Sequence, residues 1–211
     1  MTAAHEKIRR GRKFDQVLEG ARTVFMKDGF EGASVDDIAR TAGVSKATLY
    51  SYFPDKRLLF AEVAKGECIR QADSAIELID SDKDPATVLR QAGRHIISFF
   101  TSDFGLSMFR ICVAETDRFP ELGAQFYQSG PALVRDRLTA YLEKACARGE
   151  LQIDDLGLAA DQFAELCKVT FFPRLLCGVQ QRFSTAETDR VLHGAVEMFL
   201  ARYGSHARPR T

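Results

Sequence analysis

The chain has 211 residues, no formal net charge and 45% hydrophobic residues. That size allows one or two small domains with a buried core. No stretch approaches the roughly 18 apolar residues of a membrane-spanning helix, and the start of the chain lacks the apolar region of a signal peptide. We therefore expect a soluble, cytoplasmic protein with no membrane partner.

The charge is unevenly distributed along the chain. Residues 1–60 carry 11 Lys and Arg against 8 Asp and Glu, whereas the remainder carries 18 against 21, so the two parts have net charges of +3 and −3. The basic residues concentrate in residues 5–13. This asymmetry suits an N-terminal part that meets phosphate groups and a C-terminal part that does not. Taken alone, the basic run is equally compatible with an ordinary solvated terminus.

Apolar residues recur at helical spacing throughout, and no stretch alternates with period two. The sequence therefore predicts an all-α protein of about nine helices. The first helix carries an apolar stripe between Phe14 and Phe25 and ends at Gly29. Together with the two short helices that follow, it predicts a three-helix unit.

Residues 34–56 read S-V-D-D-I-A-R-T-A-G-V-S-K-A-T-L-Y-S-Y-F-P-D-K. Two short helical patterns meet at a turn in which Gly43 supplies a positive φ. We expect the side chains of Ser34 and Ser45 to cap the starts of the two helices, and Pro54 to end the second. This is the helix-turn-helix arrangement, which places its second helix in the major groove of DNA.

The same residues resemble a known family. The run A-x-x-A-G-V-S-K-A-T-L-Y-S-Y-F-P-D-K, preceded by F-x-x-D-G-F-E-G-A-S-V at residues 25–35, is similar to the DNA-binding signature of TetR-type bacterial transcriptional regulators. The L-Y-x-[YH]-F-x-[DNS]-K extension makes this match specific. The region 109–178, with R-F-P-E-L at 118–122 and A-R-G-E-L at 147–151, resembles the ligand-binding domains of one branch of that family.

The resemblance implies a division of the chain. Residues 1–55 would form the helix-turn-helix DNA-binding domain, in which residues 1–12 are a basic and flexible arm. Residues 56–204 would form a helical domain that binds an effector and dimerises. Residues 205–211 are polar and basic, and we expect a disordered tail.

The candidate DNA contacts lie in and around the second motif helix. They are Ser34, Ser45, Lys46, Ala47, Thr48, Tyr50, Ser51, Tyr52 and Lys56. Lys46 is able to donate to guanine, and the methyl groups of Ala47 and Thr48 suit contact with thymine. The resemblance assigns Ser34, the two tyrosines and Lys56 to phosphate contacts, which position a protein without reading sequence. Asp36 would repel phosphate and is given no role.

The later helices are marked by capping residues and breakers. Asp55 caps a long fourth helix, Pro85 begins the next, and Gly130-Pro131 should kink or split the stretch 120–148. Asp154 or Asp155 opens the following helix. Ser184-x-x-Glu187 is a capping box that begins the last one.

Sixteen phenylalanines and no tryptophan favour an apolar or aromatic effector over a highly charged one. The candidate lining residues of the effector pocket are Phe99, Phe100, Phe104, Phe109, Cys112, Phe126, Tyr127, Phe163, Cys167, Phe171 and Arg174. Four charged residues are candidates for orienting the effector: Arg110, Glu115, Lys168 and Arg174. The sequence does not decide which of these side chains point inward.

The resemblance also implies that the last two helices pair across a two-fold axis, so that the operator is palindromic. The apolar residues that would form this four-helix seam are Phe163, Val191, Leu192, Val196 and Phe199.

Two other classes of protein stay open as alternatives: an all-helical enzyme with an unrecognised site, and a ligand-free architectural DNA-binding protein. The chain has no G-x-S-x-G, no Walker loop and no dinucleotide-binding glycine cluster. Five cysteines without a C-x-x-C predict reduced core thiols, although a redox-sensing thiol stays open. Four scattered histidines give no metal-ligand spacing, and we expect neither metal nor cofactor.

We expect the effector to lower operator affinity, which would make the protein a repressor relieved by a small molecule. The opposite response, in which ligand promotes DNA binding, stays open. The sequence identifies neither the effector nor the operator.

Overall fold

The computed structural model describes residues 11–78 and 83–205, without the side chains of residues 71–78. Most of the predicted basic arm and the tail from residue 206 lie outside the described residues. Ser205 is described, and its backbone amide donates to the carbonyl oxygen of Glu150 at 3.1 Å.

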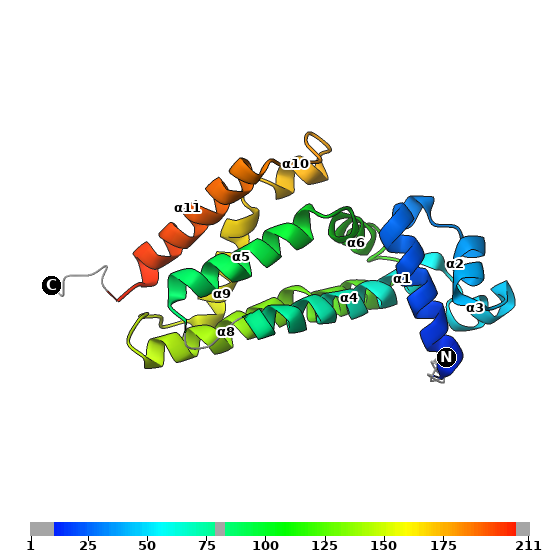
Figure 1. Ribbon diagram of the computed structural model, residues 1–211, viewed down its shortest axis with the longest axis horizontal. Helices are drawn as coiled ribbons and strands as arrows, with labels where there is room; N and C mark the ends of the chain where they lie inside the picture. Colours follow the sequence, from blue (N-terminus) through cyan, green and yellow to red (C-terminus); the bar gives the residue numbers. More distant parts are fainter. Residues whose placement is uncertain (1–10, 79–82, 206–211) are drawn as a thin grey trace. The chain divides into compact units, whose positions relative to one another are not determined.

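The described part of the chain is all-α, as predicted (Figure 1). Its helices are α1 (Arg12–Gly32), α2 (Val35–Ala42), α3 (Lys46–Tyr52), α4 (Lys56–Leu78), α5 (Pro85–Thr101), α6 (Asp103–Ala114), α7 (Pro120–Ser129), α8 (Pro131–Ala147), α9 (Leu156–Lys168), α10 (Phe172–Leu176) and α11 (Thr185–Tyr203). Within this part no single helix has the length and hydropathy needed to cross a membrane; α5 and α6 meet that criterion only when taken together across the bend between them.

Two breaks add helices to the predicted set. The stretch 120–148 is split into α7 and α8, because Gly130 has non-helical dihedral angles (φ −114°, ψ −91°) and Pro131 begins a new helix. The chain after α9 is interrupted before Pro173, which lies in the first turn of the short helix α10. Pro131 and Pro173 lack a backbone N–H, so both are compatible with a helix start and unfavourable in a helix interior.

The helix caps predicted at Asp155 and Ser184 are present, and Asp84 adds a cap at the start of α5 that was not predicted. Asp84 and Asp155 accept hydrogen bonds from the backbone amides three residues further on, at 3.0 and 2.9 Å. Ser184 and Glu187 form the complete capping box at the start of α11. Hydrogen bonds from the backbone amide and hydroxyl of Ser184 lower the pKa of Glu187, so the box is formed with an ionised carboxylate at neutral pH.

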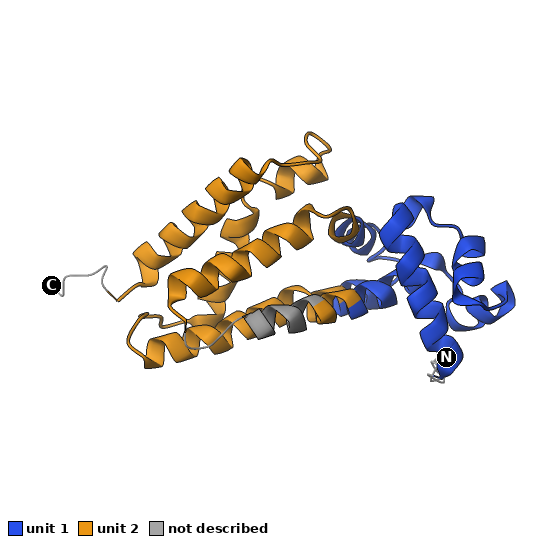
Figure 2. Cartoon of the chain, in the orientation of Figure 1, with its two compact units in different colours: residues 1–66, 107–125 blue, residues 67–106, 126–211 orange. Residues whose placement is uncertain are grey.

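The chain divides into two compact units (Figure 2). Unit 1 comprises residues 1–66 and 107–125, and unit 2 comprises residues 67–106 and 126–211. Helix α4 therefore contributes residues to both units, and each unit is built from separate segments of the chain.

Aromatic packing forms the centre of unit 1. The ring of Phe60 lies 4.9 Å from that of Phe25 and 5.1 Å from that of Phe30, measured between centroids, and all three side chains are buried. Helix α1 also packs closely on α2, because Gly20 has no side chain where Ala42 approaches. These contacts fix the position of α2 relative to α1.

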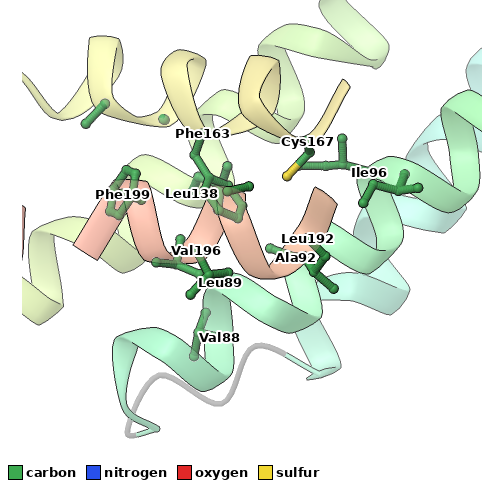
Figure 3. Close-up of a cluster of buried hydrophobic side chains, with 14 of the residues drawn as sticks. Val88, Leu89, Ala92, Ile96, Leu138, Phe163, Cys167, Leu192, Val196 and Phe199 are labelled. Atoms are coloured by element: carbon green, nitrogen blue, oxygen red, sulfur yellow. The ribbon is translucent and has the colours of Figure 1, made fainter. Parts of the chain in front are cut away.

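The core of unit 2 lies between α5, α8, α9 and α11 (Figure 3). Phe163 and Phe199 pack edge to face, with their ring centroids 5.5 Å apart, and Leu192 lies beside them. The end of α11 is held by the segment before α9, since the amide of Gln152 donates to the carbonyl oxygen of Tyr203 at 2.8 Å. This core supports the other elements of unit 2.

Gly20→Ala tests the close approach of α1 and α2. The added Cβ would lie 2.6 Å from Ala42 Cβ and 2.7 Å from its backbone nitrogen, so the two helices must separate. We expect the free energy of unfolding to fall by about 1–3 kcal/mol, although alanine has a higher helix propensity. Chemical denaturation followed by circular dichroism measures the change.

Gly32→Ala is the matched control in the same segment, because its Cβ would lie 3.5 Å from Asp28 Cβ, an ordinary contact. Equal stabilities of the two variants would contradict the packing argument.

Candidate nucleic-acid interface and ligand cavity

The helix-turn-helix of unit 1 is built by local capping. Ser34 caps α2, since its hydroxyl oxygen accepts a hydrogen bond from the Asp37 amide at 3.0 Å. The Ser34 hydroxyl also donates to the Asp37 carboxylate, and this bond holds the pKa of Asp37 below its usual value. Gly43 ends α2 in the left-handed region (φ 64°, ψ 34°), where a side chain would be strained. The predicted turn is therefore confirmed.

Helix α3 is fixed at both ends and along its inner face. The Ser45 hydroxyl oxygen accepts from the Thr48 amide at 3.1 Å. Leu49 is 1% exposed, and Phe53 packs on the Phe14 ring at 5.4 Å between centroids. The ring of Tyr52 contacts the same Phe14 edge to face at 5.6 Å. The helix thus presents one defined outer face.

That outer face carries most of the predicted DNA contacts. Ser45, Lys46, Ala47, Tyr50 and Ser51 are exposed. Thr48, Tyr52, Ser34 and Lys56 are half-buried. The exposed set begins at the N-terminal end of α3, which is the end that reaches base edges in helix-turn-helix proteins.

Lys46 forms an ion pair with Asp36, which lies in the first turn of α2. Sequence reasoning missed this pair, because it gave Asp36 no role beyond repelling phosphate. Both side chains are more than half exposed, so the pair is easily opened by water or by another anion. Asp36 therefore neutralises a lysine on the outer face without burying it.

The ammonium of Lys56 donates hydrogen bonds to backbone carbonyl groups of the protein itself. Its ammonium donates to the carbonyl oxygens of Phe30 at 2.8 Å and Ala33 at 3.0 Å, and it lies 4.3 Å from the centroid of the Phe30 ring. The family resemblance assigned Lys56 to the phosphate contacts. In the structure it joins the start of α4 to the end of α1.

A polar hollow of unit 1 lies beside Lys56. Arg57 forms ion pairs with the carboxylates of Glu115 at 3.1 Å and Asp55 at 3.3 Å. These residues and Arg110 line the hollow. Arg110 and Glu115 were candidates for orienting an effector in the pocket of the C-terminal domain. The structure places both in unit 1, at this network.

Unit 2 contains a cavity of about 320 Å³. It is lined by residues of α4, α5, α7, α8 and α9, and Phe99, Phe100, Phe126 and Tyr127 from the predicted set are among them. Lys168, a candidate for orienting the effector, also lines it. Lining residues that the sequence did not indicate include Cys68, His95, Ser129, Val134, Arg135, Arg137, Asp161 and Glu165.

The other predicted pocket residues lie elsewhere. Phe163, Cys167 and Phe171 are at most 1% exposed and belong to the core of unit 2 rather than to the cavity wall. Burial raises the pKa of the Cys167 thiol to about 12, so the thiol stays protonated at neutral pH. The remaining members do not line the cavity: Phe104, Phe109 and Cys112 on α6, and the exposed Arg174 on α10.

The residues expected at a dimer seam are buried within one copy of the chain. Phe163, Val191, Leu192, Val196 and Phe199 are between 0 and 8% exposed, and all pack in the core of unit 2. A side chain that is buried in its own copy offers no surface to a second one. The helical stripe was identified correctly, but it faces the intrachain core.

Two protein-family models together match most of the described chain. Residues 17–63 match the model of the bacterial regulatory proteins of the TetR family. Residues 87–205 match the model of the C-terminal domain of AefR-like transcriptional repressors. The first match covers α2 and α3, and the second covers most of unit 2.

The curated relatives AcnR and IcaR each match less than a third of this chain. The transcriptional repressor AcnR of Corynebacterium diphtheriae is 37% identical over 62 residues, which are 29% of this chain and 33% of AcnR. The negative regulator IcaR of the Staphylococcus aureus biofilm operon is 33% identical over 51 residues, 24% of this chain and 27% of IcaR. The matches thus span a third or less of these relatives' length.

Solved structures resemble almost the whole chain. A TetR-family transcriptional regulator from Mesorhizobium loti is 30% identical with a TM-score of 0.78, and 92% of this chain and 97% of that chain are covered. The flavonoid-responsive regulator FrrA is 34% identical with a TM-score of 0.65, and 94% and 100% of the two chains are covered.

Lys56→Met and Lys46→Met should differ in stability. Lys56→Met leaves two partly buried carbonyl oxygens without their donor, so we expect the free energy of unfolding to fall by about 1–3 kcal/mol. Lys46→Met removes an exposed ion pair, and we expect a change below about 1 kcal/mol. Urea denaturation followed by circular dichroism compares the two. Equal effects would show that the hydrogen bonds of Lys56 do not support the junction of α1 and α4.

Proposed function

The chain belongs to the TetR family of bacterial transcriptional regulators, and we propose that it acts in the cytoplasm as a ligand-responsive repressor. In this proposal a homodimer binds a palindromic operator in double-stranded DNA. A small apolar or aromatic effector binds in unit 2 and releases the dimer from the operator.

The outer face of α3 is the observation that carries this proposal. Leu49 is buried, whereas Lys46, Ala47, Tyr50 and Ser51 are exposed on a helix capped at its start. A lysine is able to donate to guanine, and methyl groups suit thymine, so this face has the chemistry to read bases. Tyr50 is suited to contact a phosphate.

The ion pair of Lys46 and Asp36 adds selectivity to the proposal. Away from its operator, the protein keeps Lys46 on Asp36 and so weakens non-specific attraction to phosphate. At a guanine in the correct position, a direct contact replaces this exposed pair at low cost. Asp36 therefore lowers the affinity for other DNA sequences and does not itself raise the affinity for the operator.

We propose that the dimer forms through the outer faces of α9 and α11. Leu158 on α9, Val169 directly after α9 and Met198 on α11 are 51, 64 and 62% exposed, although each is apolar. Gly194, one turn before Met198, has no neighbouring atom within 4 Å of a built Cβ, so a partner helix is able to approach closely there. This replaces the seam that the sequence predicted from the buried stripe.

The effector response is assigned to α4. This helix carries Lys56 at its start, beside the end of α1, and Cys68 further on, in the wall of the cavity. A ligand that binds better when α4 is displaced must weaken DNA binding by the same coupling free energy, typically about 1–3 kcal/mol. A small displacement suffices, because two recognition helices must match a fixed half-site spacing.

The cavity wall supports an aromatic effector. Phe99, Phe100 and Phe126 provide aromatic surface, and FrrA, at 34% identity, is described as responsive to flavonoids, which are aromatic molecules. AcnR and IcaR are described as repressor and negative regulator, which supports repression rather than activation as the outcome of DNA binding.

Met198→Glu tests the dimer face. The introduced carboxylate would lie between two copies, so we expect monomers with an unchanged thermal unfolding midpoint for the protomer core. Phe199→Glu is the contrast, because Phe199 is 2% exposed and its replacement buries an unpaired charge in the core. We expect that variant to unfold or aggregate. Sedimentation velocity that finds Met198→Glu dimeric at micromolar concentration would place the interface elsewhere.

Selection of bound sequences from random DNA tests the function as a whole. We expect a palindromic site that binds at least about 10³-fold more tightly than unrelated DNA at physiological salt. Lys46→Ala should weaken the operator by about 1–3 kcal/mol and relax the preference at one base pair of each half-site. Lys144→Ala, which removes an exposed lysine from α8 in unit 2, is the control. If the unaltered protein binds all DNA sequences with equal affinity, the proposed repressor function is excluded.

A further inference from the structure

The cavity of unit 2 has a cation on its inner wall. The side chain of Lys168 is 16% exposed, and its ammonium lies 4.8 Å from the centroid of the Phe100 ring and 5.7 Å from that of Phe172. An ammonium is attracted to aromatic faces at this distance. Among the described lining residues with a formal charge, the other four are exposed: Arg135, Arg137, Asp161 and Glu165.

The carboxylates near this cation face solvent. Glu165 binds the Lys168 ammonium at 2.5 Å, yet its side chain is 72% exposed. Asp161 is 52% exposed and lies 3.8 Å from Arg135, which is 46% exposed. Such exposed pairs contribute little free energy, so Glu165 is a counterion that is readily exchanged. An anion inside the cavity would meet the ammonium from the protein side while Glu165 turns to water.

The wall beside Lys168 is aromatic and aliphatic. The rings of Phe99 and Phe100 pack edge to face with centroids 5.6 Å apart, and Ile96 and Leu138 close the wall toward the core. A volume of about 320 Å³ lies at the lower end of the range for small-molecule sites. The cavity therefore combines an apolar slot of modest size with one largely buried cation, Lys168, in its wall.

We propose that this cavity takes aromatic acids. The ring system of the ligand lies against Phe99 and Phe100, and its ionised acid group binds Lys168 in place of Glu165. A charge taken into an apolar site needs a counterion, and Lys168 supplies it. That this ligand is also the effector rests on the proposed function, but its binding can be measured without DNA.

Two fluorescent probes with the same ring skeleton separate charge from apolar contact. They are 8-anilino-1-naphthalenesulfonate and N-phenyl-1-naphthylamine, which lacks the sulfonate. In titrations of the full chain, we expect a lower Kd for the sulfonate. Lys168→Met should raise the Kd of the sulfonate about tenfold and leave that of the amine unchanged, whereas Lys168→Arg should keep the preference.

Three variants complete the design. Glu165→Gln removes the competing counterion and should lower the Kd of the sulfonate severalfold. Lys144→Met, which removes an exposed lysine outside the cavity, should change neither Kd. Ala164→Phe adds a ring to the cavity wall and should weaken both probes, which places them in this cavity. Circular dichroism confirms that each variant is folded.

Equal affinities of the unaltered protein for the two probes would overturn the proposal, as would an equal loss of both in Lys168→Met. Probes that still bind Ala164→Phe normally would overturn it as well. None of these results affects the selection of operator sequences from random DNA. The proposal on ligand class can therefore fail while the proposed repressor function is retained. If instead the protein binds the sulfonate as expected but shows no operator selectivity, the proposed repressor function fails and the proposed ligand class stands.

Discussion

A helix of seven residues has too few internal hydrogen bonds to be stable in isolation, and α3 is such a helix. Its shape is imposed by the Ser45 cap and by burial of Leu49 and Phe53, the latter against Phe14 of α1. The position of α1 depends in turn on the aromatic cluster of Phe25 and on its contact with α2. The orientation of the exposed face of α3 is therefore a property of the whole of unit 1.

The junction at Lys56 extends this dependence to α4. Its ammonium satisfies the carbonyl oxygens of Phe30 and Ala33, where α1 ends, while the same helix provides Cys68 to the cavity of unit 2. Lys56 therefore has a structural role in the folded protein. Two of its three ammonium protons are used by these carbonyl oxygens, which leaves one for a further acceptor.

Local features were predictable from the sequence because they depend on neighbouring residues. The caps at Asp155 and Ser184, the turn at Gly43 and the break at Gly130 each follow from a short pattern, and all are present. The family match was also carried by contiguous residues. These signals need no knowledge of which helices touch.

Long-range features were not predictable in the same way. A helical stripe such as that of Phe163 and Phe199 shows that a face is apolar, but not whether it meets the same chain, a ligand or a second copy. The ion pair of Asp36 with Lys46 and the place of Lys168 beside Phe100 join residues of different helices. They follow only from the packing of those helices.

The pairing of residues 203–205 with residues 150–152 has a consequence for biosynthesis. Unit 2 draws core side chains from α11, and unit 1 draws residues 107–125 from the middle of the chain. Neither unit has all its parts when the helix-turn-helix leaves the ribosome. The DNA-reading segment is thus synthesised first but reaches its final support later, and the nascent chain exposes apolar faces until α11 has emerged.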